Sequence, residues 1–253
     1  MNLLCGLILT GVLVGMLHDS LGSTKVAYLT DTAIESGAQL KAGDVILSVN
    51  GEKVHTSYDL QYTLFREGKD KNTVKVKRDG EVITLHDVSF TETVKVDTET
   101  ENGIEEVEVT RYVFRLERDS FTAGTFFKHT FNRAFTTVEM VWESVFDLIT
   151  GKYGLEQMSG PVGITKEIGN AATEKDGGKS LINLTALIAL NLGVMNLLPF
   201  PALDGGRIVF LVIEGIRRKP LSKQVEGYIH MAGMLLLLLL MLLVTFQDVT
   251  RLF

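Results

Sequence analysis

Apolar residues gather in three runs without Asp, Glu, Lys or Arg, at residues 1–17, 181–203 and 229–246. A bilayer crossing needs about 20 apolar residues, and the second and third runs have about that length. The first run is shorter, and we interpret it as an incomplete span whose beginning is missing. The pattern predicts a multi-pass α-helical membrane protein with three spans in this chain.

The polar segment at residues 204–228 predicts the orientation of these spans. It contains five basic residues, Arg207, Arg217, Arg218, Lys219 and Lys223. Lys and Arg concentrate in the cytoplasmic loops of membrane proteins. We therefore expect 204–228 to be a cytoplasmic loop and residues 18–180 to be extracytoplasmic.

In residues 24–90 the long apolar runs give way to short segments with strand or helix periodicity, which predict a small α+β domain. The stretch GDVILSVNG alternates apolar and polar positions before an Asn-Gly turn. The stretch TSYDLQYTLFREG carries a cap residue and an apolar helical stripe, and we expect its helix to end at Gly68. The stretch NTVKVKRDGEVITLHDV alternates around Asp79-Gly80, which is typical of a hairpin.

Two further segments lie between this domain and the second apolar run. Residues 91–120 alternate as acidic strands and predict a β-hairpin extension with a turn at Asn102-Gly103. Residues 121–150 predict an amphipathic helix, whose apolar stripe is formed by Phe131, Phe135, Val138, Trp142, Val145 and Ile149. Such a helix either lies at the outer membrane interface or packs under the α+β domain, and the pattern leaves both open.

Charge and cysteine content narrow the range of partners only slightly. The net charge of −6 sits largely in the middle of the chain, which argues against a nucleic-acid partner. The chain has one cysteine, Cys5, so an intrachain disulfide is excluded.

The stretch NLLPFPALDGG places polar and helix-breaking residues at membrane depth. Asp204 has three candidate roles there: metal ligand, ion-coupling carboxylate, or cap of a helix at 206–217. Asn191 and Asn196 are costly in a span unless they bind something. Pro199 and Pro201 free backbone groups that must face protein or water rather than lipid. The stretch therefore predicts a polar, partly unwound pocket.

The stretch LKAGDVILSVNGEKV resembles the core of a PDZ domain of the bacterial protease-associated type. The resemblance implies that residues 24–90 bind an extended peptide, which would add a strand to a sheet edge beside the helix.

The stretch NLGVMNLLPFPALDGG resembles the signature of the site-2 protease family (M50), zinc metalloproteases that cut peptide bonds within membranes. SGPVGI, at residues 159–164, resembles the short element that precedes this span in the family, and the PDZ-like domain sits where the bacterial members carry theirs. The resemblance covers essentially the whole chain. It implies a multi-pass protein of the bacterial inner membrane that cleaves single-pass membrane substrates, such as an anti-sigma factor or a remnant signal peptide.

The same resemblance implies roles for individual residues. Asp204 matches the third ligand of the Zn²⁺ ion, and Asn191 and Asn196 match residues that hold the substrate backbone extended. Gly205 and Gly206 would allow close approach of the chain at the site, and the two prolines would shape its wall. A catalytic zinc takes three protein ligands and a water, whose pKa it lowers towards about 7.

The other two ligands and the general base of the family come from a His-Glu-x-x-His motif, which this sequence lacks. Its five histidines are His18, His55, His86, His129 and His230, and no two of them are four residues apart. The start, Met1-Asn2 followed by LLCGLILTG, resembles the end of the family's second-span element. We therefore expect a protease without its first span, inactive in this form.

Two other hypotheses remain at this stage. The chain could be a non-catalytic, membrane-anchored PDZ adaptor or pseudoprotease that keeps the fold without the metal. It could also be a transporter fragment, because proline-broken spans with an intramembrane Asp also coordinate ions. The PDZ-like domain between spans and the lack of an inverted repeat argue against the transporter.

Overall fold

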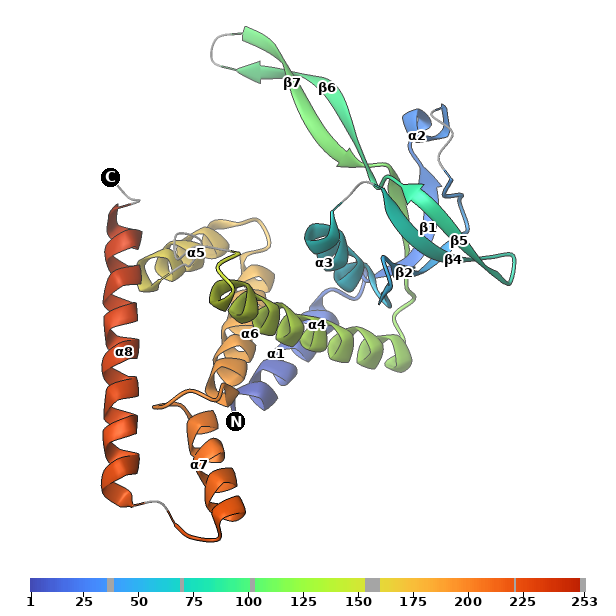
Figure 1. The fold of residues 1–253 in the computed structure, drawn as a ribbon. Helices are drawn as coiled ribbons and strands as arrows, with labels where there is room; N and C mark the ends of the chain where they lie inside the picture. Colours follow the sequence, from blue (N-terminus) through green and yellow to red (C-terminus); the bar gives the residue numbers. More distant parts are fainter. Residues whose placement is uncertain (36–38, 69–70, 101–102, 153–159, 221, 251–253) are drawn as a thin grey trace. The chain divides into compact units, whose positions relative to one another are not determined.

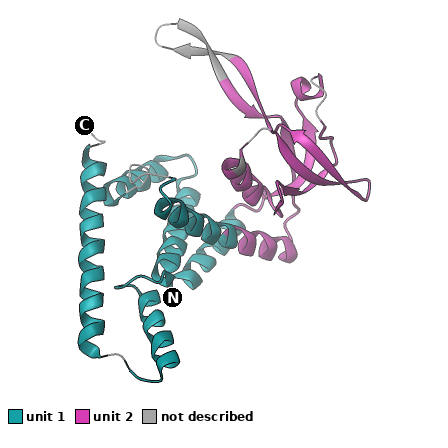
Figure 2. Cartoon of the chain, viewed as in Figure 1, with its two compact units in different colours: residues 1–16, 134–253 teal, residues 17–133 magenta. Residues whose placement is uncertain are grey.

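The computed structural model describes the chain except for residues 36–38, 69–70, 101–102, 153–159, 221 and 251–253 (Figure 1). The described residues divide into two compact units, residues 17–133 and residues 1–16 with 134–253 (Figure 2). We call them the sheet unit and the helical unit.

The sheet unit is built on an antiparallel sheet in the order β5-β4-β2-β1-β8, with β3 paired to β2. Its strands are β1 (Gly22–Leu29), β2 (Val45–Val49), β3 (Glu52–Lys53), β4 (Asn72–Arg78), β5 (Glu81–Val88) and β8 (Phe114–Arg118). The outer strands of this order are β5 and β8. The turns form where the sequence predicts them, with positive φ at Asn50, Gly51, Asp79 and Gly80.

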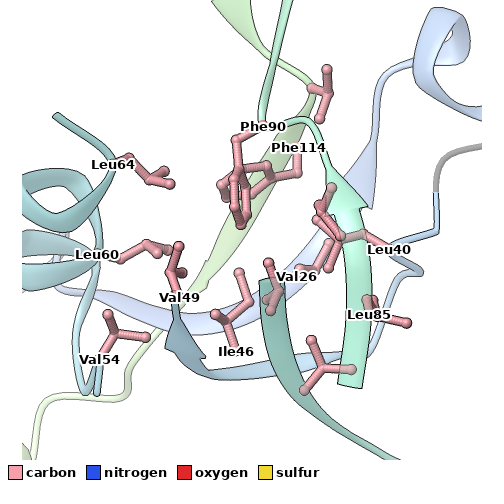
Figure 3. Packing of buried hydrophobic residues seen from close by; sticks show 14 of the residues in the cluster. Val26, Leu40, Ile46, Val49, Val54, Leu60, Leu64, Leu85, Phe90 and Phe114 are labelled. Atoms are coloured by element: carbon pink, nitrogen blue, oxygen red, sulfur yellow. The ribbon is translucent and has the colours of Figure 1, made fainter. Parts of the chain in front are cut away.

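Helix α3 (Ser57–Glu67) covers the sheet, and a short helix, α2 (Asp31–Glu35), follows β1. A capping box starts α3, in which the Thr56 amide donates to Asp59 Oδ1 at 2.7 Å. Leu60 and Leu64 of α3 share one buried cluster with Val26, Ile46 and Phe114 of the sheet (Figure 3). The apolar side chains of the helix and those of the strands therefore pack together in a single core.

A buried ion pair closes one side of this core. Asp44 precedes β2 and has no exposed side-chain surface; it accepts from Arg78 Nε and Nη2, each at 2.7 Å, and from the Lys41 amide at 2.8 Å. Burial alone would raise the pKa of Asp44, but these hydrogen bonds and the Arg78 charge outweigh it and hold the pKa below its usual range. The carboxylate is therefore charged in the folded unit at neutral pH.

The region from residue 91 to 120 is not one hairpin extension. Strands β6 (Thr91–Thr100) and β7 (Gly103–Tyr112) form a separate two-stranded ribbon. The chain then returns to the main sheet, where β8 pairs with β1 through Val26↔Leu116. The α+β domain thus extends beyond residue 90, because β8 supplies Phe114 to its core. The predicted turn at Asn102 lies outside the described residues.

Helix α4 (Ala123–Ile149) runs from the sheet unit into the helical unit. Its small and polar residues His129, Thr130, Ala134, Thr136 and Thr137 are buried. Its large apolar residues are exposed: Phe127, Phe131, Phe135, Trp142, Phe146 and Ile149. Helix α4 thus buries small and polar side chains and exposes its large aromatic ones, while Val138 and Val145 of the predicted stripe are half-buried.

The helical unit contains α1 (Asn2–Met16), α5 (Pro161–Thr173), α6 (Gly177–Leu197), α7 (Asp204–Arg217) and α8 (Lys223–Thr250). Among the described helices, α6 and α8, of 21 and 28 residues, are long and apolar enough to cross a membrane. Helix α1 is apolar but has only 15 residues. The expected loop at 204–228 is largely helical, because α7 occupies its first part.

Helices α1 and α6 pack closely through glycines. A Cβ on Gly6 would lie 2.6 Å from Leu190 Cγ of α6, and a Cβ on Gly193 would lie 2.7 Å from Leu3 Cγ of α1. Each glycine accommodates a leucine of the other helix. Small residues allow such close helix contacts in membranes, where the hydrophobic effect contributes little to helix association. This packing places the α6 face that carries Gly193 against α1.

Candidate functional site

Helix α6 ends at Leu197, six residues before the end of the predicted span at 203. The cause is local, because Pro199 lacks an N–H and disfavours helical geometry in the residue before it. Leu198 accordingly has φ −59° and ψ 140°, and its amide donates to the Met195 carbonyl at 3.1 Å. The backbone therefore leaves the helix between Asn196 and the proline and aspartate residues of the motif.

A tight turn follows over residues 200–203. The Leu203 amide donates to the Phe200 carbonyl at 3.1 Å, with Pro201 and Ala202 between them. Ala202 has φ +84°, the value that a type II turn requires at its third residue and that glycine usually supplies. A non-glycine residue in this region costs about 1–3 kcal/mol, which the surrounding packing must offset.

Helix α7 begins at Asp204, directly after this turn. Leu203 occupies the cap position, so Asp204 is the first helical residue and its side chain makes no capping hydrogen bond. The structure therefore does not support the helix-cap interpretation of Asp204. The carboxylate is exposed and has no hydrogen bond or ion pair with any residue that the structure describes.

The two glycines after Asp204 are buried against the end of α6 and the turn. A Cβ on Gly205 would lie 2.6 Å from the Leu197 carbonyl carbon, and one on Gly206 would lie 2.9 Å from that of Phe200. Both contacts involve backbone atoms, so a side chain at either position would force the turn away from α7. The two glycines therefore let α7 pack tightly against the end of α6 and the turn.

Asn191 and Asn196 lie on α6 before the turn. Five residues separate them, so at 3.6 residues per turn they point in directions about 140° apart. Asn191 is exposed and Asn196 is half-buried. Neither side chain has a hydrogen-bond partner among the described residues. All three polar side chains of the motif thus lack a protein partner among the described residues.

The histidines do not complete a metal site. Within the described parts of the chain, no group of three or more His, Cys, Asp or Glu side chains could hold a metal ion. His129 belongs to the sheet unit, where its Nε2 lies 2.9 Å from Asp119 Oδ2, beside Lys128 Nζ at 3.2 Å. Burial would raise the pKa of Asp119, but hydrogen bonds from these two residues hold it below its usual range. This cluster is an ion-pair network rather than a metal site.

Two residues of α8 make contacts within the helical unit that the sequence pattern did not indicate. Asp248, which is buried, accepts from the Gly163 amide at 3.0 Å and so ties α8 to the first turn of α5. Helix α5 thus begins within the SGPVGI element, at Pro161. Gly233 packs against Pro201 of the turn. These pairings join residues more than 30 positions apart. The only local signals for them are a Gly within the last apolar run and an Asp just after it.

Comparisons with known proteins agree with the motif. The model of peptidase family M50 matches residues 1–240. The chain is 36% identical over 231 residues to the "Regulator of sigma-W protease RasP" of Bacillus subtilis (strain 168), covering 90% of this chain and 51% of that protein. It is 33% identical over 228 residues to the "Zinc metalloprotease RasP" of Geobacillus kaustophilus, covering 90% and 51%. A "Putative zinc metalloprotease" of Staphylococcus aureus (strain MSSA476) is 33% identical over 240 residues, covering 91% and 53%.

The chain spans about half the length of the curated relatives it matches. The matched region includes the asparagines, the proline-broken turn and Asp204. A family model that covers residues 1–240 of 253 accounts for both units. The chain belongs to peptidase family M50.

Proposed function

We propose that the chain supplies one part of the active site of a zinc-dependent intramembrane endopeptidase. Asp204 is the zinc ligand in this proposal, Asn191 and Asn196 hold the substrate backbone, and the prolines and glycines shape the pocket. The observation that carries the proposal is the break between α6 and α7. Asp204 directly follows it, Asn191 and Asn196 lie on α6 before it, and none of the three side chains has a partner among the described residues. Unpartnered polar groups at membrane depth are costly and mark functional sites.

The residues present do not form a zinc site on their own. Asp204 is one ligand, and catalytic zinc takes three protein ligands. We propose that the other two come from a His-Glu-x-x-His element that this sequence does not contain. The names of the relatives, two of which are zinc metalloproteases, support zinc as the metal.

The test is metal analysis and a cleavage assay on the complete gene product. About one zinc per molecule, together with cleavage of a single-pass membrane substrate that a chelator abolishes, would support the proposal. A complete gene that encodes no His-Glu-x-x-His would exclude it. Candidate substrates are an anti-sigma factor or a remnant signal peptide, and the sigma-W regulator among the relatives favours the first.

A non-catalytic, membrane-anchored adaptor is the second candidate function. It is favoured by one observation, that the sheet unit has its own buried core and a sheet that ends at the strands β5 and β8. Under this hypothesis the purified protein contains no stoichiometric zinc and retains only the peptide-binding activity of its sheet unit. The same metal analysis therefore separates the two functions.

We further propose a three-span arrangement in the bacterial cell membrane, formed by α1, α6 and α8. The basic residues between α6 and α8 support a cytoplasmic position for α7, and the sheet unit is then extracytoplasmic. The exposed apolar surface of α8, from Met234 to Leu243, supports contact with lipid.

We propose that the sheet unit is a PDZ-like peptide-binding domain whose open edge is β8. Strand β8 ends the sheet order, and its Phe114 shares the core with Leu60 and Leu64 of α3. A peptide added to β8 would extend the sheet by one strand, as peptide binding by strand addition requires.

A peptide carrying the new end of a cleaved substrate should slow amide exchange in β8. Its backbone would pair with the free N–H and C=O groups of that edge, whereas the opposite edge, β5, would stay unpaired. Hydrogen-exchange mass spectrometry of the complete gene product should show at least about a threefold slowing at residues 114–118 and none at 81–88. Equal slowing at both edges, or at neither, would contradict this assignment.

For α4 we propose the membrane-interface position rather than packing under the sheet unit. The polar contacts of α4 with the sheet unit use its other face, where Asn132 Nδ2 donates to Thr56 Oγ1 at 3.1 Å and Arg133 lies 4.0 Å from the Tyr58 ring centroid. The aromatic stripe remains outward, and interfacial helices bury such a stripe in the headgroup region.

The single tryptophan of the chain, Trp142, lies on this stripe and reports its environment. In nanodiscs, lipids brominated near the headgroup should quench its fluorescence by about half or more, because the indole would sit within the acyl boundary. Replacing Phe135 and Phe146 with Glu should reduce the quenching. A water-soluble quencher that reaches Trp142 equally well with and without lipid would show that the stripe faces solvent.

A further inference from the structure

Helix α8 touches the proline turn of the motif at one residue, Gly233. A Cβ added there would lie 2.6 Å from the carbonyl carbon of Pro201 and 2.7 Å from its Cβ, and nearer still to its carbonyl oxygen. Real Cβ atoms do not approach other atoms this closely, so a side chain at 233 requires the backbone of the turn to move. Gly233 is also buried, whereas the apolar residues around it on α8 are mostly exposed.

Other glycines of the same region do not share this contact. A Cβ on Gly227, six residues earlier in α8, would meet nothing within 4 Å, and the same holds for Gly215 of α7. Glycine is unfavourable in a helix interior compared with alanine. At 227 the structure gives no packing reason for it, but at 233 the turn leaves no room for a side chain.

The contact falls at the centre of the motif. Pro201 is the second residue of the turn, between Asn196 on α6 and Asp204 on α7. Gly206 of α7 also lies against this turn, and Gly205 lies against the end of α6, so α7 and α8 both pack against the same short backbone segment. A side chain at 233 would therefore displace the turn and, with it, the carboxylate that follows.

We propose that Gly233 is a positioning residue of the proposed active site: its lack of a side chain sets where α8 places Pro201, and so where Asp204 lies. The expected effect of Gly233 on catalysis rests on the proposed function. The expected effect of Gly233 on the turn is independent of that function and can be measured without activity.

The experiment compares Gly233→Ala with Gly227→Ala in the complete gene product. Restoring ordinary contact at 233 requires a backbone shift of roughly 1 Å, and a misplacement of this size can lower a rate by about 100-fold. We expect kcat to fall by about that factor in Gly233→Ala with KM changed less than about threefold, while Gly227→Ala keeps both values. Unchanged kcat in Gly233→Ala, or an equal loss in both variants, would overturn the proposal.

Hydrogen exchange provides the readout that does not depend on activity. The Leu203 and Gly206 amides donate to the Phe200 and Leu203 carbonyls, each at 3.1 Å. These bonds should weaken in Gly233→Ala, so peptides covering residues 198–206 should exchange at least about tenfold faster, with α1 unchanged. Wild-type exchange there would overturn the proposal. Loss of protection throughout α6 and α8 would also overturn it, since Gly233 would then serve general helix packing. If the wild-type protein shows no chelator-sensitive cleavage, the proposed function fails, and the exchange comparison still decides the role of Gly233.

Discussion

Replacing Asp204 with alanine in the complete gene product should remove most of its bound zinc and abolish its peptidase activity. Loss of groups that only support metal ligands costs about 10- to 100-fold in metal affinity, so loss of a ligand should cost at least about 100-fold. The structure adds a second expectation. Because Asp204 has no partner among the described residues, its removal should leave the fold intact, apart from about 0.3–1 kcal/mol of helix-dipole interaction.

Asp31 provides the matched control for this variant. It is also an exposed first residue of a helix, α2, but lies in the sheet unit. Asp31→Ala should lose the same helix-dipole interaction and keep both zinc and activity. Zinc content measured by inductively coupled plasma mass spectrometry, beside thermal unfolding, separates the effects. Full zinc occupancy in Asp204→Ala would rule out its role as a ligand.

Replacing Asp44 with alanine should destabilise the sheet unit by about 3–5 kcal/mol. The Asp44 side chain is fully buried and accepts hydrogen bonds from Arg78 Nε and Nη2, each at 2.7 Å. The variant therefore leaves the mostly buried Arg78 guanidinium without its charge partner. Hydrogen exchange of β2 and β4 amides gives the free energy of opening for the strands on either side of the pair. Glu117→Ala, which removes the exposed pair with Lys25 at 2.9 Å, should cost less than about 1 kcal/mol.

The Asp44 pair also predicts how stability depends on pH. The folded-state pKa of Asp44 lies below its unfolded value, so its contribution is present above about pH 4 and is lost as the pH falls through the folded value. The opening free energy of β2 and β4 should therefore fall more steeply below pH 4 in the wild-type protein than in Asp44→Ala. Parallel curves for the two proteins would show that Asp44 titrates alike in both states.

Local pattern was enough to predict the elements whose cause is local. The alternation around Asp79-Gly80 gives a hairpin because a two-residue turn with positive φ closes it. The stripe with Leu60 and Leu64 gives α3, which Gly68 ends with φ +92°. The break in α6 follows from Pro199, although the helix ends six residues earlier than the predicted span.

Long-range packing could not be predicted in the same way. Strand β8 joins β1 across almost 90 residues, and nothing in the alternation of 91–120 distinguishes it from the ribbon before it. The outward direction of the α4 aromatic stripe depends on which face the rest of the fold buries. At the site, the motif indicated Asp204, Asn191 and Asn196, but Gly233 lies on another helix and shows its role only through its contact with Pro201.

Ala202 has a consequence for the order in which the site is assembled. Its φ of +84° is unfavourable for an alanine, so residues 200–203 gain their shape from the structure around them rather than from their own sequence. One of the surfaces that enforces it is α8, which begins only at Lys223 and contacts the turn at Gly233. During synthesis, the motif therefore leaves the ribosome before the helix that packs against its turn. A nascent chain that ends before residue 233 would carry Asn196, Pro201 and Asp204 without their final arrangement.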